Sequence, residues 1–173
     1  MMRASPRLLA GAAGVFYLLT ILTGASALFA WRGRPAAAAL AALCYVVVTL
    51  LFYPLFKPVS RSLSLVAAFV SLAGCSIGFF SGVPNPLVLF GCYCLLIGFL
   101  IVRSTFLPHA LGALMAFGGL GWLTFLSPSL AHALAPYNLA PGILGESSLT
   151  LWLLVKGVDV PKWEEQAASQ RRI

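Results

Sequence analysis

The sequence predicts an all-α membrane protein: a bundle of six transmembrane helices with short loops and both chain ends in the cytoplasm. Of the 173 residues, 61% are hydrophobic and only 9% are charged, and the mean hydropathy is +0.98. A soluble domain of ordinary composition is about half apolar and about a quarter charged. Because too few polar side chains remain to cover a water-facing surface, the bilayer must be the solvent for most of the chain.

Six apolar stretches are long enough to cross the hydrocarbon, which needs roughly 20 helical residues. Proline and glycine separate them: Arg32–Pro35 breaks the first run, Lys57-Pro58 closes the second after an expected kink at Pro54, and Ser81–Pro86 is a turn. Ser104 or Thr105 is expected to cap the fifth helix. The predicted spans are Leu8–Ala30, Ala36–Phe56, Ser62–Phe80, Pro86–Val102, Pro108–Leu126 and Tyr137–Val155.

The first span has an alternative interpretation as a secretory signal peptide. Arg3 and Arg7 form a basic start, and Ala25-Ser26-Ala27 has the small residues of a cleavage site. The apolar run, however, continues to Trp31, which is longer than a typical signal core, and further spans follow directly. We therefore expect an uncleaved first helix.

The orientation of the helices follows from the basic residues, since Lys and Arg are enriched in cytoplasmic loops. With the N-terminus inside, nine basic residues fall in cytoplasmic segments and two, Arg32 and Arg34, in external ones. This asymmetry predicts an even number of spans, with both chain ends on the cytoplasmic side of a plasma or inner membrane. Four of the nine are expected at the membrane interface. The nine are Arg3, Arg7, Lys57, Arg61, Arg103, Lys156, Lys162, Arg171 and Arg172, and the interfacial ones are Lys57, Arg61, Arg103 and Lys156.

Two parts of the chain are predicted: a six-helix transmembrane domain at 1–156 and a cytoplasmic tail at 157–173. The tail is expected to form a short interfacial helix, with acidic residues in its first turn and Arg171-Arg172 at its end, as the helix dipole favours. Trp163 would suit the headgroup region. A simple anchor is a better explanation of this tail than a partner-binding motif.

Several stretches resemble a bacterial membrane family known as domain of unknown function 4386. They are Phe16–Thr20, Leu55–Leu63, Leu96–Ser104 with Phe106–Pro108, and Gly145–Ser148 continuing through Leu151–Val158. The resemblance implies a multi-helix membrane fold and little about activity. The chain departs from the family in its short first connection, Trp31–Pro35, and in the uncharged third helix, where members often carry charge.

Glu146 is the only acidic residue before the tail. It precedes Lys156 by ten residues, which at 1.5 Å each places it about 15 Å from the inner boundary, near mid-membrane. An ionised group at that depth is costly, so such residues usually face the bundle interior and often mark a functional path. The alternative is a structural carboxyl that hydrogen-bonds a neighbouring helix. Gly142, Ser147, Ser148 and Thr150 would make its surroundings polar.

His132 is expected toward the external end of the fifth helix, where it could approach Glu146 and relay a proton, although an interfacial polar role is commoner for such a residue. His109 lies at the cytoplasmic border. The four cysteines sit inside apolar runs. Neighbours two apart diverge on a helix, so packing rather than metal binding is expected, and we predict neither a metal nor a cofactor. The cysteines are Cys44, Cys75, Cys92 and Cys94.

Small residues recur at helix-packing intervals in the fourth and fifth spans. Such residues let two helix backbones approach closely, and packing is their expected role. They are Gly91, Gly98, Gly112, Ala116 and Gly119.

No metalloprotease, hydrolase, Walker or dinucleotide motif occurs, and Glu146 has no obvious carboxylate partner, so a non-enzymatic role is favoured. Basic residues form no stripe beside aromatic platforms, which excludes a nucleic-acid partner. Two function classes remain. The first is an accessory or sensing protein that binds lipid, a hydrophobic ligand, another membrane protein or a second copy of itself. The second is a small carrier or channel with Glu146 as a proton- or cation-responsive group.

Overall fold

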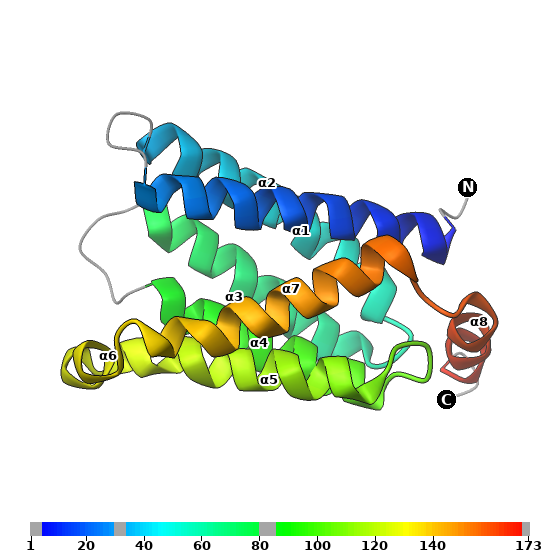
Figure 1. Ribbon diagram of the computed structural model, residues 1–173. Helices are drawn as coiled ribbons and strands as arrows, with labels where there is room; N and C mark the ends of the chain where they lie inside the picture. The colour runs from blue at the N-terminus through cyan, green and yellow to red at the C-terminus, as the bar shows by residue number, and fades with distance from the viewer. Residues whose placement is uncertain (1–4, 30–33, 80–85, 171–173) are drawn as a thin grey trace.

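The computed structural model describes residues 5–29, 34–79 and 86–170, and helices account for nearly all of them (Figure 1). No strand occurs in these ranges. Two short 3-10 turns, Thr124–Leu126 and Tyr137–Leu139, flank the shortest helix. The helices are α1 (Pro6–Phe29), α2 (Arg34–Phe56), α3 (Arg61–Phe79), α4 (Pro86–Arg103), α5 (His109–Leu123), α6 (Pro128–Leu134), α7 (Ala140–Val155) and α8 (Val160–Ser169).

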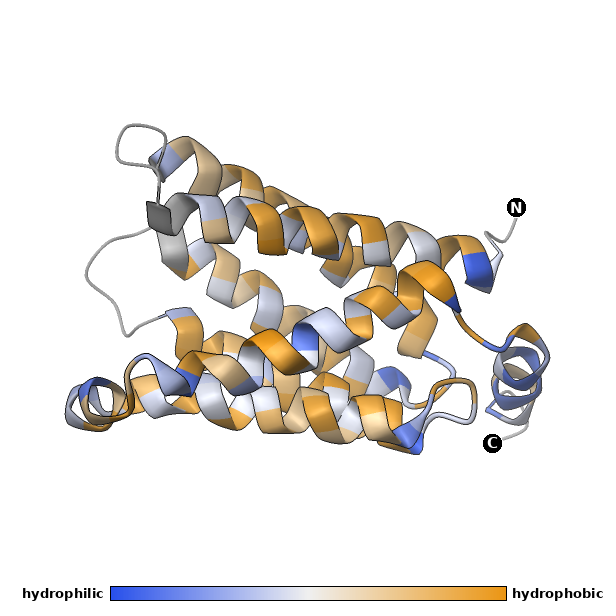
Figure 2. Ribbon diagram, in the orientation of Figure 1, coloured by the Kyte–Doolittle hydropathy of each residue, from blue (hydrophilic) through white to orange (hydrophobic). Residues whose placement is uncertain are grey.

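The surface of the bundle is that of a membrane protein. Four described helical segments are long and apolar enough to cross a bilayer: Pro6–Ser26, Pro35–Phe56, Pro86–Arg103 and His109–Leu126. The apolar part of α3, Arg61–Ile77, is shorter. Figure 2 shows apolar residues along the length of the helices and hydrophilic ones mostly near their ends. Water would oppose the exposure of so many large apolar side chains, so these helices fit an integral membrane protein.

The long helices follow the predicted spans to within a few residues, with one difference beyond the fifth span. There the chain forms α6, which was not predicted. Ser127 caps this helix by accepting a hydrogen bond from the Leu130 N–H at 3.4 Å, and Pro128 occupies its first turn. Ser-Pro is a recognised helix start, but seven residues are too few to show an apolar period.

The expected cap of the fifth helix was wrong. The residue before α5 is Pro108, and no side chain caps the helix there. The Ser104 hydroxyl instead donates to the Ile101 carbonyl at 2.8 Å, and Thr105 contacts α8. Helix α2 continues through Pro54. The predicted turns at 32–33 and 81–85 and the basic pair at 171–172 lie outside the described residues.

In the described ranges the long helices close a ring in which each contacts two neighbours, in the order α1, α2, α3, α4, α5, α7 and back to α1. Both ends of the chain lie at the same end of this ring (Figure 1), which we call the tail end. The core inside the ring is rich in aromatic side chains. Its largest fully buried residues include Tyr17, Phe52, Phe56 and Tyr93.

Helix α8 lies across the tail end of the ring (Figure 1) and is bonded to it. The Trp163 indole N–H donates to the Leu55 carbonyl at 2.8 Å, and the Gln166 amide donates to the Arg103 carbonyl at 3.2 Å. These carbonyls belong to the last turns of α2 and α4, where no intrahelical donor remains. Trp163 therefore joins α8 to the end of α2, and its place in the headgroup region stays a prediction.

Candidate functional site

Glu146 lies inside the bundle, as expected for a lone carboxyl in an apolar helix. Its side chain is 8% exposed, and its Oε1 accepts a hydrogen bond from the Trp122 indole N–H at 2.8 Å. Trp122 comes from the last turn of α5, and Glu146 from the middle of α7. The hydrogen bond therefore joins two neighbouring helices of the ring.

Gly142 makes this hydrogen bond possible. It lies one turn before Glu146 on α7, and a Cβ atom built there would stand 2.6 Å from the Trp122 ring. Only glycine leaves room for the indole at this point. Phe90 contacts the other side of Trp122 edge-to-face at 5.4 Å between ring centroids, and Phe125 stacks at 6.2 Å. The indole is thus held in place by packing as well as by the carboxyl.

Polar side chains from five helices of the ring lie in the interior near the middle of the bundle. Each belongs to the central part of its helix, and each is at most 8% exposed. We call this set the central polar layer. Its members are Tyr17 of α1, Tyr45 and Thr49 of α2, Ser71 of α3, Tyr93 of α4, and Glu146 and Thr150 of α7.

The members of this layer touch one another. The Tyr45 ring packs edge-to-face against Tyr17 at 6.0 Å and against Tyr93 at 5.6 Å between centroids. The hydroxyls of Thr49 and Ser71 share a hydrogen bond of 2.6 Å. Tyr17 and Tyr45 also lie within electrostatic range of the Glu146 carboxyl. The sequence analysis singled out Glu146 but missed the tyrosines, because no spacing within one helix shows that several helices meet at one level.

Four hydroxyls in the layer are buried and make no hydrogen bond of good geometry among the described residues. They belong to Tyr17, Tyr45, Tyr93 and Thr150. A buried polar group without a partner costs about 1–3 kcal/mol, and such groups are rare in native proteins. The layer is therefore the least satisfied part of an otherwise well-packed interior.

The prediction that His132 lies in the fifth helix was wrong. The residue belongs to α6 and is exposed, and within the described residues the hydrogen-bond donor to Glu146 is Trp122. The Ser-Pro pair that begins α6 ends the preceding helical segment and carries His132 away from the core. His109 begins α5 at the tail end.

The predicted interfacial basic residues all lie at the tail end. Lys57 follows α2, Arg61 begins α3, Arg103 ends α4 and Lys156 follows α7, and all four are exposed. The Arg103 guanidinium lies 5.1 Å from the centroid of the Phe99 ring. The tail end of the ring therefore carries positively charged side chains on four of its helices.

The cysteines are distributed over three helices: Cys44 is on α2, Cys75 on α3, and Cys92 and Cys94 on α4. All four are free thiols. Within the described residues no cluster of three or more His, Cys, Asp or Glu side chains could hold a metal ion. Cys94 is fully buried and packs in the core.

The small residues of the fourth and fifth spans lie where α4 and α5 meet. A Cβ atom at Gly98 would stand 2.7 Å from the Gly112 carbonyl oxygen and 2.8 Å from the Ala116 nitrogen. A Cβ atom at Gly91 would stand 2.9 Å from the Gly119 carbonyl oxygen. The two backbones are therefore in direct contact along this interface, which we call the glycine seam.

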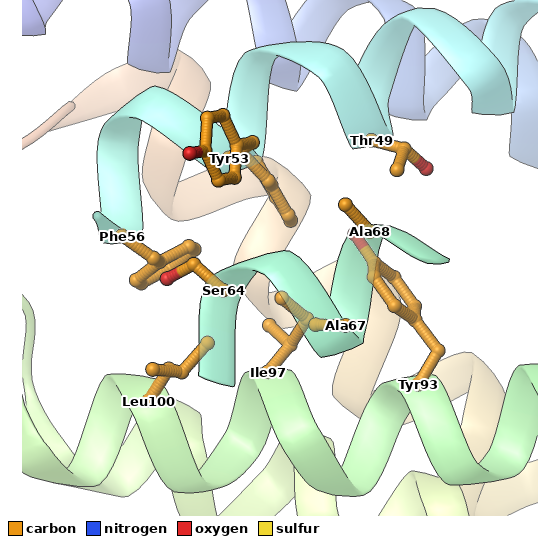
Figure 3. Close-up of a pocket in the computed structure, with 10 residues that line it drawn as sticks. Thr49, Tyr53, Phe56, Ser64, Ala67, Ala68, Tyr93, Ile97 and Leu100 are labelled. Carbon is orange, nitrogen blue, oxygen red and sulfur yellow. The ribbon is translucent and has the colours of Figure 1, made fainter. Parts of the chain in front are cut away.

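Two cavities border the core. The first is a narrow crevice that lies between α2, α3 and α4 and reaches Thr49 and Tyr93, with Ser64 and Tyr53 at its walls (Figure 3). It is too narrow for a water molecule. The second is a cleft of about 420 Å³ at the tail end, which we call the tail-end cleft. Its lining includes apolar Phe106, Trp152 and Val158 together with Lys156 and Lys162.

Comparison with known proteins supports the family resemblance. The profile of the family described as "Domain of unknown function (DUF4386)" matches residues 81–157, a stretch that includes Trp122, Gly142 and Glu146. An uncharacterized protein of Archaeoglobus fulgidus is 27% identical over 127 residues, which cover 65% of this chain and 76% of that protein. No solved structure matches the chain.

Proposed function

We propose that this chain is a non-enzymatic membrane protein that binds an anionic lipid in the tail-end cleft. In this proposal the chain crosses the cell membrane six times, with both termini and the tail end in the cytoplasm. The observation that carries the proposal is the cleft itself: it brings the partly exposed Trp152 ring together with two lysines at one end of an apolar bundle. A lipid has the same two parts, an acyl chain and a charged headgroup.

The chemistry of the cleft favours a negatively charged headgroup. Lys156 is exposed. Among the described residues, Lys162 forms an ion pair with Asp159 at the start of its own helix, at 3.4 Å, and 59% of the lysine side chain is exposed. An exposed pair of this kind is weak, so a phosphate can compete for the ammonium group. Each basic residue close to an anionic leaflet contributes about 1 kcal/mol of attraction. Trp152 and Pro108, which are partly exposed in the lining, would contact the first carbons of the acyl chains.

Native mass spectrometry of the protein after exchange into mixed lipids tests this proposal. We expect retention of phosphatidylglycerol in preference to phosphatidylcholine, and loss of that preference in the double variant Lys156→Gln/Lys162→Gln. The matched control is Lys57→Gln, which removes an exposed lysine at the same end but outside the cleft lining. Equal retention of the two lipids by the unaltered protein would contradict the proposal.

The proposed topology rests on the nine-to-two distribution of basic residues in the sequence and on the position of Lys57, Arg61, Arg103 and Lys156 at the tail end. Reporters active only in the cytoplasm or only outside it, fused to the C-terminus, test it. A signal from the external reporter alone would overturn the six-span arrangement.

A small carrier or channel is the second candidate function, and one observation favours it. The central polar layer places Glu146 and several hydroxyls deep in the bundle, where carriers commonly hold their coupling groups. Tracer uptake by purified protein in liposomes decides between the two candidates. The carrier requires uptake that disappears in Glu146→Gln, whereas the lipid-binding protein gives none.

A further inference from the structure

We propose that the central polar layer is a hydrated proton-binding site, in which water held by the tyrosine hydroxyls exchanges protons with the Glu146 carboxyl. The inference is independent of lipid binding, because the layer and the tail-end cleft have no residue in common. Its ligands are water and the proton that Glu146 binds and releases.

The first support is the set of hydroxyls that the protein leaves unpaired. Tyr17, Tyr45, Tyr93 and Thr150 are 0%, 6%, 1% and 1% exposed, and among the described residues none makes a hydrogen bond of good geometry. Tyr45 lies near Tyr17, and Thr49 lies near Tyr93, so two of these hydroxyls have at most a weak protein partner. The contacts between the three tyrosine rings place the hydroxyl-bearing side chains in one region. Buried water typically makes about three hydrogen bonds to groups that would otherwise be unsatisfied, which is what this region offers.

The second support is the surroundings of Glu146. The groups that face it are Tyr17 from α1, Trp122 from α5, and, across the ring, Tyr45 of α2 and Cys94 of α4. None of these is basic, and no Lys, Arg or His is among the buried described residues. Within the described residues the carboxyl accepts one hydrogen bond, at Oε1 from the Trp122 indole N–H. Water is therefore the partner that can satisfy the carboxyl and supply or remove its proton.

The pocket of Figure 3 is the place where we expect water to enter once a wall side chain moves. It lies between α2, α3 and α4 and ends at Thr49 and Tyr93 of the layer, and the unpaired Ser64 hydroxyl also lines it. Since it is too narrow for water, a side chain at its wall has to shift to admit one. Tyr53, which is only half-buried, is the residue with room to do so.

Hydroxyl-radical footprinting of the intact protein in detergent tests the hydration, because radicals formed from bound water oxidise the side chains beside it. We expect oxidation of Tyr17, Tyr45 and Tyr93 despite their burial. Met115 is the control, since it is fully buried but carries a side chain more easily oxidised than tyrosine. Protection of all three tyrosines would overturn the proposal, and so would equal oxidation of Met115, which would indicate general opening of the bundle.

Fluorescence of Trp122 tests whether the Glu146 carboxyl binds and releases a proton. With Trp31→Phe, Trp152→Phe and Trp163→Phe in place, the remaining indole is the donor to Glu146. We expect its emission to shift in a single transition as the pH rises, and the transition to be lost when Glu146→Gln is added. A transition that persists in the Gln variant, or none in either protein, would refute proton binding by Glu146.

Discussion

The glycine seam and the central polar layer are two ways of filling the inside of the same bundle. Along the seam, α4 and α5 approach until a Cβ atom at Gly98 would overlap the opposite backbone, and no polar side chain is needed. In the layer, the ring encloses tyrosines whose hydroxyls make no hydrogen bond of good geometry within the described part of the chain. In a membrane, helix association depends on close packing and interhelical hydrogen bonds rather than on the hydrophobic effect. At the glycine seam the two helices associate through close packing of their backbones. The central polar layer has many groups that can form interhelical hydrogen bonds, and several of these groups form none of good geometry with the residues that the structure describes.

The comparison predicts that the seam tolerates substitution least. Gly98→Ala should destabilise the protein by about 1–3 kcal/mol or more, because the added methyl meets backbone atoms of Gly112 and Ala116 that cannot move independently. Thermal unfolding in detergent measures the effect. Gly11→Ala is the matched control: a Cβ atom there meets nothing within 4 Å, so the change should be neutral or stabilising. Equal stability of the two variants would contradict the close contact at the seam.

Where α7 meets α5, we expect substitution to cause a smaller loss of stability than at the glycine seam. Gly142→Ala places a methyl 2.6 Å from the Trp122 ring, so the indole must move and its hydrogen bond to Glu146 is lost. The expected cost is about 1–2 kcal/mol, since a side chain yields more easily than a backbone. The fluorescence emission of Trp122, measured in the protein with the other three tryptophans replaced by Phe, should change when Gly142→Ala moves the indole. An unchanged emission in a folded Gly142→Ala protein would show that the indole does not occupy this position.

Within the layer, the chemistry of the substitution should matter more than its size. Glu146→Gln keeps an oxygen that can accept from Trp122, so the bundle should assemble with little change. Glu146→Leu leaves the indole N–H unpaired, at a cost of about 1 kcal/mol or somewhat more. Size-exclusion profiles and thermal unfolding of the two variants make the comparison. If Leu were tolerated better than Gln, the hydrogen bond would have no structural role.

The smallest effect is expected at the tail. Gln166→Ala removes the bonds from Gln166 to Thr105 and to the Arg103 carbonyl, which lie near the surface, so a loss of about 0.5–1 kcal/mol is expected. Faster proteolysis of α8 should accompany it. Glu164→Ala is the control, because this exposed side chain of the same helix has no such bonds to the ring. Equal proteolysis of both variants would show that these bonds do not hold α8.

The seam and the spans could be predicted from the sequence because each depends on one helix or on two consecutive ones. Runs of apolar residues indicated the spans, and Gly91, Gly98, Gly112 and Gly119 indicated the contact between neighbours in the chain. The position of Glu146 inside the bundle could also be predicted, because a carboxyl that faces lipid at this depth is costly in free energy.

The layer and the α8 contacts could not be predicted, because they join residues far apart in the chain. Trp122 and Glu146 are 24 residues apart, and Trp163 bonds to a carbonyl 108 residues before it. Tyrosine in an apolar run is also ambiguous, since it serves equally well at an interface or in a core. Helix α6 was missed for a different reason: it is too short to show a period, and His132 was misplaced with it.

The most direct test of the account asks whether Glu146 faces the bundle interior. A carbodiimide confined to the lipid phase reacts with carboxyls that face lipid, and mass spectrometry of the intact membrane protein gives the rate. The matched reference is Leu144→Glu in a Glu146→Gln background, which moves the carboxyl two positions along α7 to a side chain that is 55% exposed. We predict rapid modification of the reference protein and slow modification of Glu146 in the unaltered protein. Equal rates in the two proteins would show that Glu146 faces lipid and would contradict the central polar layer.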